Sequence, residues 1–210
     1  MKFDGVYSGL GNTTRFGLLS LLGNEEKQLV VSQDIYRGGN QWIVTFGKSP
    51  RIIYDGAVWE TGREGDDLGI LDIDADGTYE IFAPITSFSD FADHRLSMMN
   101  VPLPSVVFKF DRRAHRYVPA NPLFAEYLLS KHKDREISPP SNADNHLGDV
   151  MKATLDYLHA RREAEAWLFF ERECKLPDKA QIKRKIESVL SGHPTFRYLK
   201  RTVPGVTGFQ

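Results

Sequence analysis

The stretch LDIDADGTYEIFA, Leu71 to Ala83, decides the fold because it aligns without gaps on LSLLGNEEKQLVV, Leu19 to Val31. The offset is constant at 52 residues, from 19 to 71 and from 31 to 83. Apolar positions coincide at Leu19 and Leu71, Leu21 and Ile73, Leu29 and Ile81, and Val30 and Phe82. A second strand pair follows each copy, at Trp42–Phe46 with Arg51–Tyr54 and at Val106–Phe110 with Arg116–Val118. Two repeats of a four-stranded unit indicate blade-like antiparallel sheets.

Composition excludes several classes of protein. The chain has 210 residues, of which 41% are hydrophobic and 26% charged, as is typical of a globular protein with a real core. A formal net charge of -1 gives no global field that would attract nucleic acid. No apolar run approaches the roughly 20 residues that insert into a bilayer. Cys174 is the one cysteine, so an intramolecular disulfide is excluded and a buried, inert thiol is expected.

Periodicity changes along the chain, and the predicted fold class is therefore α+β. Residues 1–130 read as an antiparallel β region of two propeller-blade-like repeats, and 131–145 as a polar, proline-bearing linker or exposed loop. Residues 146–200 have a helical period and predict a small C-terminal helical hairpin, and 201–210 predict a mobile tail. One apolar helix face is formed by Leu147, Val150, Met151, Thr154, Leu155, Leu158 and Trp167.

The hairpin is predicted to contain two helices. The first begins near His146 and reaches Cys174. The second begins after Asp178, which has Gln181 three residues later at the spacing of a capping box, and Gly192 stands where a helix commonly stops.

Three aspartates on alternate residues, Asp72, Asp74 and Asp76, are followed by Gly77. Carboxylate oxygens on a sharply turning loop are the chemistry that calcium requires. An EF-hand is disfavoured, because its twelfth position needs a bidentate acid and holds Ala83 here. The seventh position, Thr78, can offer its backbone carbonyl, and the ninth supplies Glu80. The alternative is an acidic turn between two strands that stays solvated.

The segment DIDADGTYEI resembles the FG-GAP or VCBS-type repeat of integrin-like propellers and exported bacterial proteins. The later segment SVVFKFDRRAHRYVPANPLFAEYLL resembles the sheet-closing hairpin that often follows it, so the resemblance extends from about Leu18 to Leu129. It implies propeller-like blades, an extracytoplasmic (periplasmic or extracellular) setting and a calcium ion held by Asp72, Asp74, Asp76, the Thr78 carbonyl and Glu80. A closed propeller takes four or more blades, so an incomplete propeller, a small sandwich and part of a larger ring stay open.

The first repeat offers an internal comparison. Its residues at the positions of the four loop acids are Ser20, Leu22, Asn24 and Gln28. That loop has no carboxylate at any of these positions, so it is not expected to hold calcium.

The sequence favours a non-catalytic calcium-binding module that binds an unknown protein or ligand. Candidate contacts are Arg37 and Trp42 at a hairpin tip, and Phe88, Phe91 and His94 within the insertion 88–100. None of the six histidines has metal-ligand spacing, and no nucleophile motif accompanies them. Two alternatives remain: a metal-assisted hydrolase that uses the aspartate loop, and an inhibitor or regulator of an exported enzyme acting through the insertion.

Overall fold

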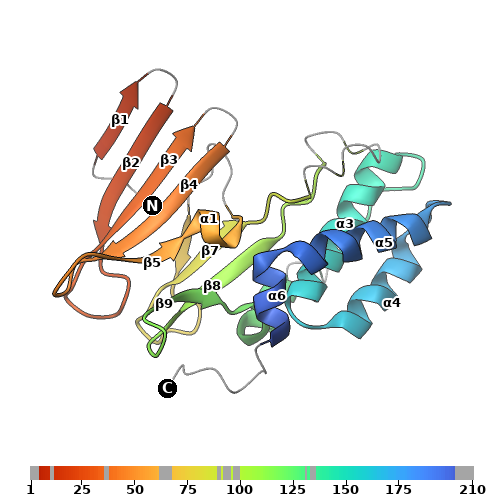
Figure 1. The fold of residues 1–210 in the computed structure, drawn as a ribbon. Helices are drawn as coiled ribbons and strands as arrows, with labels where there is room; N and C mark the ends of the chain where they lie inside the picture. Colours follow the sequence, from red (N-terminus) through yellow and green to blue (C-terminus); the bar gives the residue numbers. More distant parts are fainter. Residues whose placement is uncertain are drawn as a thin grey trace. The chain divides into compact units, whose positions relative to one another are not determined.

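A computed structural model describes residues 5–9, 12–35, 38–61, 68–88, 91, 96, 100–130, 132 and 136–201 (Figure 1). The chain divides into two compact units. Unit 1 comprises Met1–Pro84, Val106–Ala120 and Gly205–Gln210, and unit 2 comprises Ile85–Ser105 and Asn121–Pro204. The fold is mixed α+β as predicted, with antiparallel sheets in unit 1 and the longer helices in unit 2.

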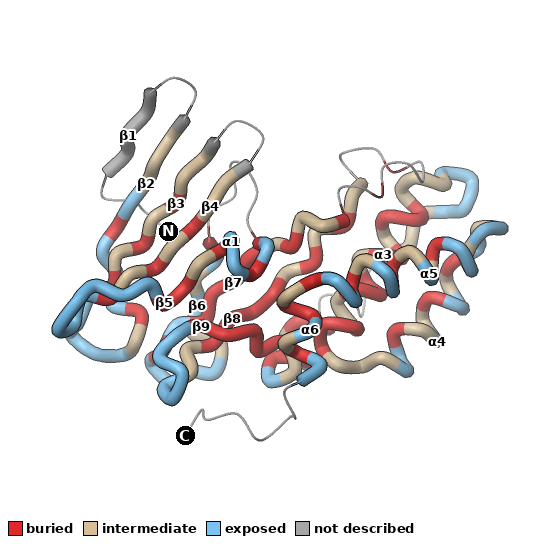
Figure 2. Tube along the Cα trace, in the orientation of Figure 1, coloured by how far each residue is buried: buried red, intermediate tan, exposed pale blue. Residues whose placement is uncertain are grey.

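The first sheet of unit 1 has five antiparallel strands in the order β1-β2-β3-β4-β5. The strands are β1 (Gly5–Gly9), β2 (Asn12–Leu19), β3 (Gln28–Ile35), β4 (Gly38–Thr45) and β5 (Arg51–Asp55). Buried and partly exposed residues alternate along β3 and β4 (Figure 2). Val30 and Ile43 are paired on the buried face and are 0% exposed, whereas Leu29 and Val44 are paired on the opposite face and are partly exposed. This alternation is typical of an antiparallel sheet with one face on the core.

The second sheet has four strands in the order β6-β7-β8-β9. They are β6 (Gly69–Leu71), β7 (Glu80–Pro84), β8 (Ser105–Asp111) and β9 (Arg116–Pro119). A short helix, α1 (Gly56–Trp59), follows β5 and begins where the Asp55 carboxylate accepts the Ala57 N–H. Tyr54 and Trp59 pack on Phe108 of β8 at ring distances of 5.1 and 5.8 Å. Neither sheet closes on itself within the described strands.

The loops that join β2 to β3 and β6 to β7 repeat one hydrogen-bond pattern at the predicted offset. In the first loop the Leu21 N–H donates to the Gln28 side chain at 2.8 Å, and in the second loop the equivalent Ile73 N–H donates to Glu80 at 2.8 Å. A second equivalent pair of bonds runs from the Glu26 N–H to Asn24 at 3.2 Å and from the Thr78 N–H to Asp76 at 2.7 Å. Gly23 and Ala75, which are also equivalent, both have left-handed backbones with φ of 71° and 56°. The sequence repeat therefore corresponds to two loops of the same local structure.

The two loops also touch. The Tyr79 N–H donates to the Leu21 carbonyl at 2.8 Å. A Cβ atom on Gly23 would lie 2.8 Å from the Gly77 carbonyl oxygen, a distance that side chains do not adopt. Glycine at position 23 thus serves both the left-handed backbone and the close approach of the second loop.

The described residues of unit 2 form a short 3-10 helix, η2 (Asn121–Phe124), and five α-helices. The α-helices are α2 (Ala125–Ser130), α3 (Ala143–His159), α4 (Glu163–Glu173), α5 (Lys179–Gly192) and α6 (Pro194–Arg201). The predicted apolar face of the first helix is confirmed on α3, where Leu147, Val150, Met151, Thr154, Leu155 and Leu158 are all buried. Trp167 lies on α4 instead and is partly exposed.

The predicted two-helix hairpin is wrong in its first helix, which is interrupted between α3 and α4. Arg161 has a left-handed backbone with φ of 61°. Its N–H donates to Leu158 O at 3.1 Å, and the Arg162 N–H donates to Tyr157 O at 3.0 Å. This pair of bonds is the Schellman motif, which ends a helix and usually has glycine at the left-handed position. Because arginine stands at this position, the sequence shows no signal for the end of the helix.

The predicted start of the second helix is confirmed, since α5 begins at Lys179 directly after Asp178. The Asp178 side chain makes no capping hydrogen bond, however, so the capping box is not formed. Cys174 is 2% exposed, and burial raises its pKa, as expected of an inert thiol. The predicted tail 201–210 lies outside the described residues except for Arg201, as do positions 131 and 133–135 of the predicted linker.

Candidate functional site

Residues 72–80 form a compact acidic loop between β6 and β7. The Asp72 carboxylate accepts the N–H groups of Asp76 and Gly77, both at 3.1 Å. Asp76 in turn accepts the Thr78 N–H at 2.7 Å. Ala75 and Gly77 have left-handed backbones with φ of 56° and 83°, which turn the chain sharply. These bonds fix the loop through its own backbone and aim several carboxylates to one side.

Lys109 of β8 places its ammonium group among these carboxylates. Its Nζ atom donates to Asp74 at 2.8 Å, to Asp76 at 2.8 Å and to Glu80 at 3.0 Å. The Lys109 side chain is 7% exposed and that of Glu80 0%, whereas those of Asp74 and Asp76 are 42% exposed. The loop therefore has a protein-supplied cation at its centre.

The pKa shifts agree with this arrangement. Burial on its own would lower the pKa of Lys109, but the hydrogen bonds to Asp74, Asp76 and Glu80 outweigh it and raise the pKa. Burial also opposes ionisation of Asp76, yet the bonds from Lys109 and the Thr78 N–H hold its pKa below the ordinary value. Burial raises the pKa of Glu80 despite bonds from the Ile73 N–H and Lys109. Lys109 thus stays charged, and Glu80 is the carboxyl that most needs its ammonium.

The same carboxylates have the composition of a calcium site. Oxygen atoms of Asp72, Asp74 and Glu80 lie within 4.8 Å of one another. Calcium takes six to eight oxygens at about 2.3 to 2.6 Å, so this set with water could complete a shell. Asp76 contributes a further exposed carboxylate. Thr78 is buried and donates its N–H to Asp76, and ligation by its carbonyl stays a prediction. The loop acids fit the ion chemically, but an ion at their centre would compete with the Lys109 ammonium.

The equivalent loop of the first repeat is neutral at the corresponding point. Gln28 takes the place of Glu80 and accepts the Leu21 N–H at 2.8 Å. Thr45 matches Lys109 when Trp42–Phe46 is aligned with Val106–Phe110, and it donates to Glu26 at 3.0 Å. In both repeats a side chain of the third strand therefore bonds to the loop. The bond comes from the Thr45 hydroxyl of β4 in the first repeat and from the Lys109 ammonium of β8 in the second.

Sequence reasoning missed Lys109, although a signal for it exists. Lysine interrupts the apolar run from Val106 to Phe110, in which every neighbour is of a type that strands bury. A lysine inside such a strand is expected to need a carboxylate partner, because burial of an unpaired charge is costly. The acidic loop of the same repeat provides such partners.

The other predicted contact residues lie in three different situations. Trp42 is partly exposed on β4, on the face of the sheet that is not buried. Phe88 and Phe91 are 0% exposed, with ring centroids 5.8 Å apart, and Lys185 lies over Phe91 at 4.7 Å. These two rings are buried inside unit 2, and their role in binding a partner stays a prediction. Arg37 and His94 lie outside the described residues.

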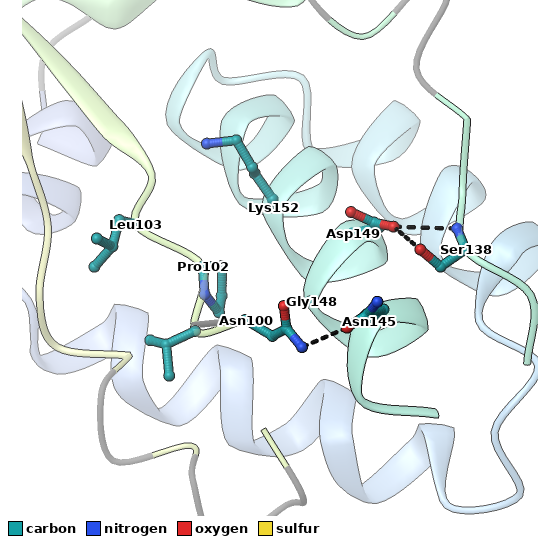
Figure 3. A pocket seen from close by; sticks show the side chains of 9 residues that line it. Asn100, Pro102, Leu103, Ser138, Asn145, Gly148, Asp149 and Lys152 are labelled. Atoms are coloured by element: carbon teal, nitrogen blue, oxygen red, sulfur yellow. Dashed lines mark hydrogen bonds between the residues drawn. The ribbon is translucent and has the colours of Figure 1, made fainter. Parts of the chain in front are cut away.

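Unit 2 contains a cavity of about 350 Å³ beside α3 (Figure 3). Its lining comes from the segment before β8, from Ser138 and from one face of α3: Asn100, Val101, Pro102, Leu103, Ser138, Asn145, Gly148, Asp149 and Lys152. The segment lies tightly on the helix, since a Cβ atom on Gly148 would be 2.6 Å from the Asn100 carbonyl oxygen. The Asn100 amide also donates to Asn145.

Ser138, His146 and Asp149 resemble a catalytic triad in residue type but not in geometry. The Ser138 hydroxyl donates directly to Asp149 at 2.6 Å. His146 is bound through Nδ1 to the Ser138 carbonyl at 2.7 Å and through Nε2 to the Lys175 N–H at 3.2 Å. Both ring nitrogens are thus occupied by backbone groups, and the imidazole is not available as a base for Ser138.

Comparison of the chain with protein-family models, with curated proteins and with solved structures finds no significant match. No helix in the described part of the chain is both long and apolar enough to cross a membrane. The likeness to FG-GAP and VCBS repeats stays a prediction, and a function has to be argued from the geometry of the loop and its lysine.

Proposed function

We propose that this chain is a non-catalytic binding module built from two propeller-blade-like sheets, in which a calcium-type loop is braced by Lys109. The observation that carries the proposal is the contact of the Lys109 Nζ with three carboxylates at 2.8, 2.8 and 3.0 Å. A cation at this point ties β8 to the hairpin of β6 and β7. The loop then serves the stability of the sheet and not a chemical reaction.

Calcium enters this proposal as a competitor of the ammonium. The loop carries four carboxylates, on Asp72, Asp74, Asp76 and Glu80, and the last three share the single Lys109 ammonium, so the loop keeps a net negative charge that attracts a cation. Inner-sphere binding requires that Lys109 leave the carboxylates, at the cost of three charge-assisted hydrogen bonds. We therefore expect weak calcium binding, at millimolar concentrations or above.

The hydrolase alternative is less well supported. Its metal would need an open coordination position and a nearby base, but the Lys109 ammonium fills the centre of the acids. The regulator alternative relied on the insertion 88–100, of which the described aromatic residues Phe88 and Phe91 are buried. An extracytoplasmic bacterial setting stays a prediction from the family resemblance.

Calorimetric titration of calcium into three proteins tests the proposal: the wild type, Lys109→Met and Lys109→Met/Asp74→Ala. Methionine removes the competing charge, so Lys109→Met is expected to bind calcium at least about tenfold more tightly than the wild type. The added Asp74→Ala change should abolish that binding. Lys48→Met is the control, because Lys48 is an exposed lysine of the same unit. Calcium affinity that is unchanged in Lys109→Met would refute the competition.

A further inference from the structure

The first sheet has one face with two adjacent rows of apolar side chains that are partly exposed in the described part of the chain. Pairing across β2, β3, β4 and β5 defines the rows: Phe16, Val31 and Trp42 in one, and Leu18, Leu29, Val44 and Ile52 in the other. Phe16, Leu18 and Ile52 are 42%, 46% and 57% exposed, and the other four are partly exposed. Phe46, the next residue in this alternation after β4, is 44% exposed. We call these eight residues the open face.

The residues of the second repeat that are equivalent to part of the open face are buried. Leu29 and Val31 of β3 correspond to Ile81 and Ala83 of β7 at the offset of 52 residues. Ile81 is 0% exposed and Ala83 1%, whereas Leu29 and Val31 are partly exposed. The same positions of the same repeat are thus fully buried in one copy and open in the other.

The open face is large enough for a specific interface. At the exposed fractions given above, its side chains present about 500 Å² of mainly apolar surface, in the range of the largest patch on a typical monomer. Two such faces would bury about 1,000 Å² together, before the rims and backbone are added, which reaches the lower limit for a specific interface.

The charge pattern indicates the occupant. Among the described residues of β2 to β5 that point to this side, Thr14, Gln33 and Asn40 are neutral, and Asp55 is the single charged residue. The Asp55 carboxylate already accepts the Ala57 N–H at the rim. A face without a field of one sign does not repel its own copy, and it offers no charges by which a different acidic or basic partner would be selected.

We propose that the open face binds the open face of a second copy of this chain, forming a two-fold symmetric dimer by sheet-on-sheet packing. Two twisted sheets pack in this way about 10 Å apart with their strands about 30° from parallel. The arrangement depends neither on calcium nor on the role assigned to Lys109, so a failure of one proposal leaves the other standing.

Sedimentation equilibrium of the full chain over a range of concentrations tests the dimer. The wild type is expected to change from a species of 23.9 kDa to one of twice that mass in the micromolar range. Leu18→Lys and Ile52→Lys each bury a charge in the interface, at the β2 end and the β5 end of the second row, and should each weaken association at least about 100-fold. Both positions are half-exposed in the monomer, so the fold should be retained, as thermal unfolding would verify.

Leu168→Lys is the matched control, because Leu168 is 72% exposed but lies on α4 of unit 2. It should dimerise like the wild type. A wild type that stays monomeric at about 200 µM would overturn the proposal, since it would leave the open face to a different partner. A dimer that persists unchanged in both Leu18→Lys and Ile52→Lys would overturn it as well, because the contact would then lie elsewhere.

Discussion

At the scale of single residues, Lys109 shows how a charge can be held inside a strand. Burial of the ammonium is unfavourable, and three carboxylates offset that cost. Glu80 depends on it in return, because its carboxylate is wholly buried and has the Ile73 N–H as its other hydrogen bond at 2.8 Å. The Lys109 and Glu80 side chains are therefore an interdependent ion pair. The effect on stability of a substitution at one of them depends on which residue stands at the other.

Gly148 is a second residue whose type is fixed by its surroundings. A Cβ atom there would lie 2.6 Å from the Asn100 carbonyl oxygen, so Gly148→Ala is expected to push the segment off α3 and destabilise unit 2 by about 1 to 3 kcal/mol. Gly192→Ala is the control, because a Cβ atom there meets nothing within 4 Å and alanine favours helix, so stability should stay or rise. Urea unfolding compares the two. Equal effects would contradict the steric explanation.

At the scale of elements, comparison of the two loops of the repeat provides a test of the Lys109–Glu80 ion pair. Lys109→Thr is expected to lose about 3 kcal/mol, because the Glu80 carboxylate stays buried without its ammonium. Glu80→Gln/Lys109→Thr recreates the neutral residues that the first loop has at Gln28 and Thr45, and should regain at least half of that loss. Urea unfolding in a chelator measures both. A double variant less stable than Lys109→Thr would contradict the equivalence of the loops.

The elements also show what the sequence could predict. The alignment of Leu19–Val31 with Leu71–Ala83 predicted two equivalent strand–loop–strand units, because the apolar alternation and the loop residues are both local signals. The interrupted helix was not predictable, since Arg161 adopts a left-handed backbone that arginine rarely occupies. The acids of the loop were found from their spacing, whereas Lys109 is 29 residues beyond Glu80 and meets it through the pairing of strands.

At the scale of the whole molecule, unit 1 depends on groups that must keep their protons. Burial raises the pKa of Tyr54 and of Tyr117, and the loop carboxylates raise that of Lys109 against the effect of its burial. The folded chain therefore holds protons that the unfolded chain releases near the ordinary values of 10.0 for tyrosine and 10.5 for lysine. The stability that these groups contribute is fully present below those values and is lost as the pH rises above them.

Urea unfolding at about pH 8 and about pH 11 measures this loss of stability. The loss is expected to exceed about 2 kcal/mol, since each group contributes on the order of 1 kcal/mol between these pH values. The Glu80→Gln/Lys109→Thr variant should lose less between the two pH values, because the lysine no longer contributes. Stability that is the same at both pH values would contradict the assignment of these groups as buried and protonated.

The most direct test of the central claim is the free energy of unfolding in a chelator and in about 1 mM calcium, for the wild type and Lys109→Met. If Lys109 is the resident cation, the wild type binds calcium with a dissociation constant of about 1 mM or above, so calcium should stabilise it by no more than about 0.4 kcal/mol. Lys109→Met, with a dissociation constant near 0.1 mM, should gain about 1.4 kcal/mol. A wild type that loses several kcal/mol in the chelator would show that a metal ion, and not the lysine, holds the loop.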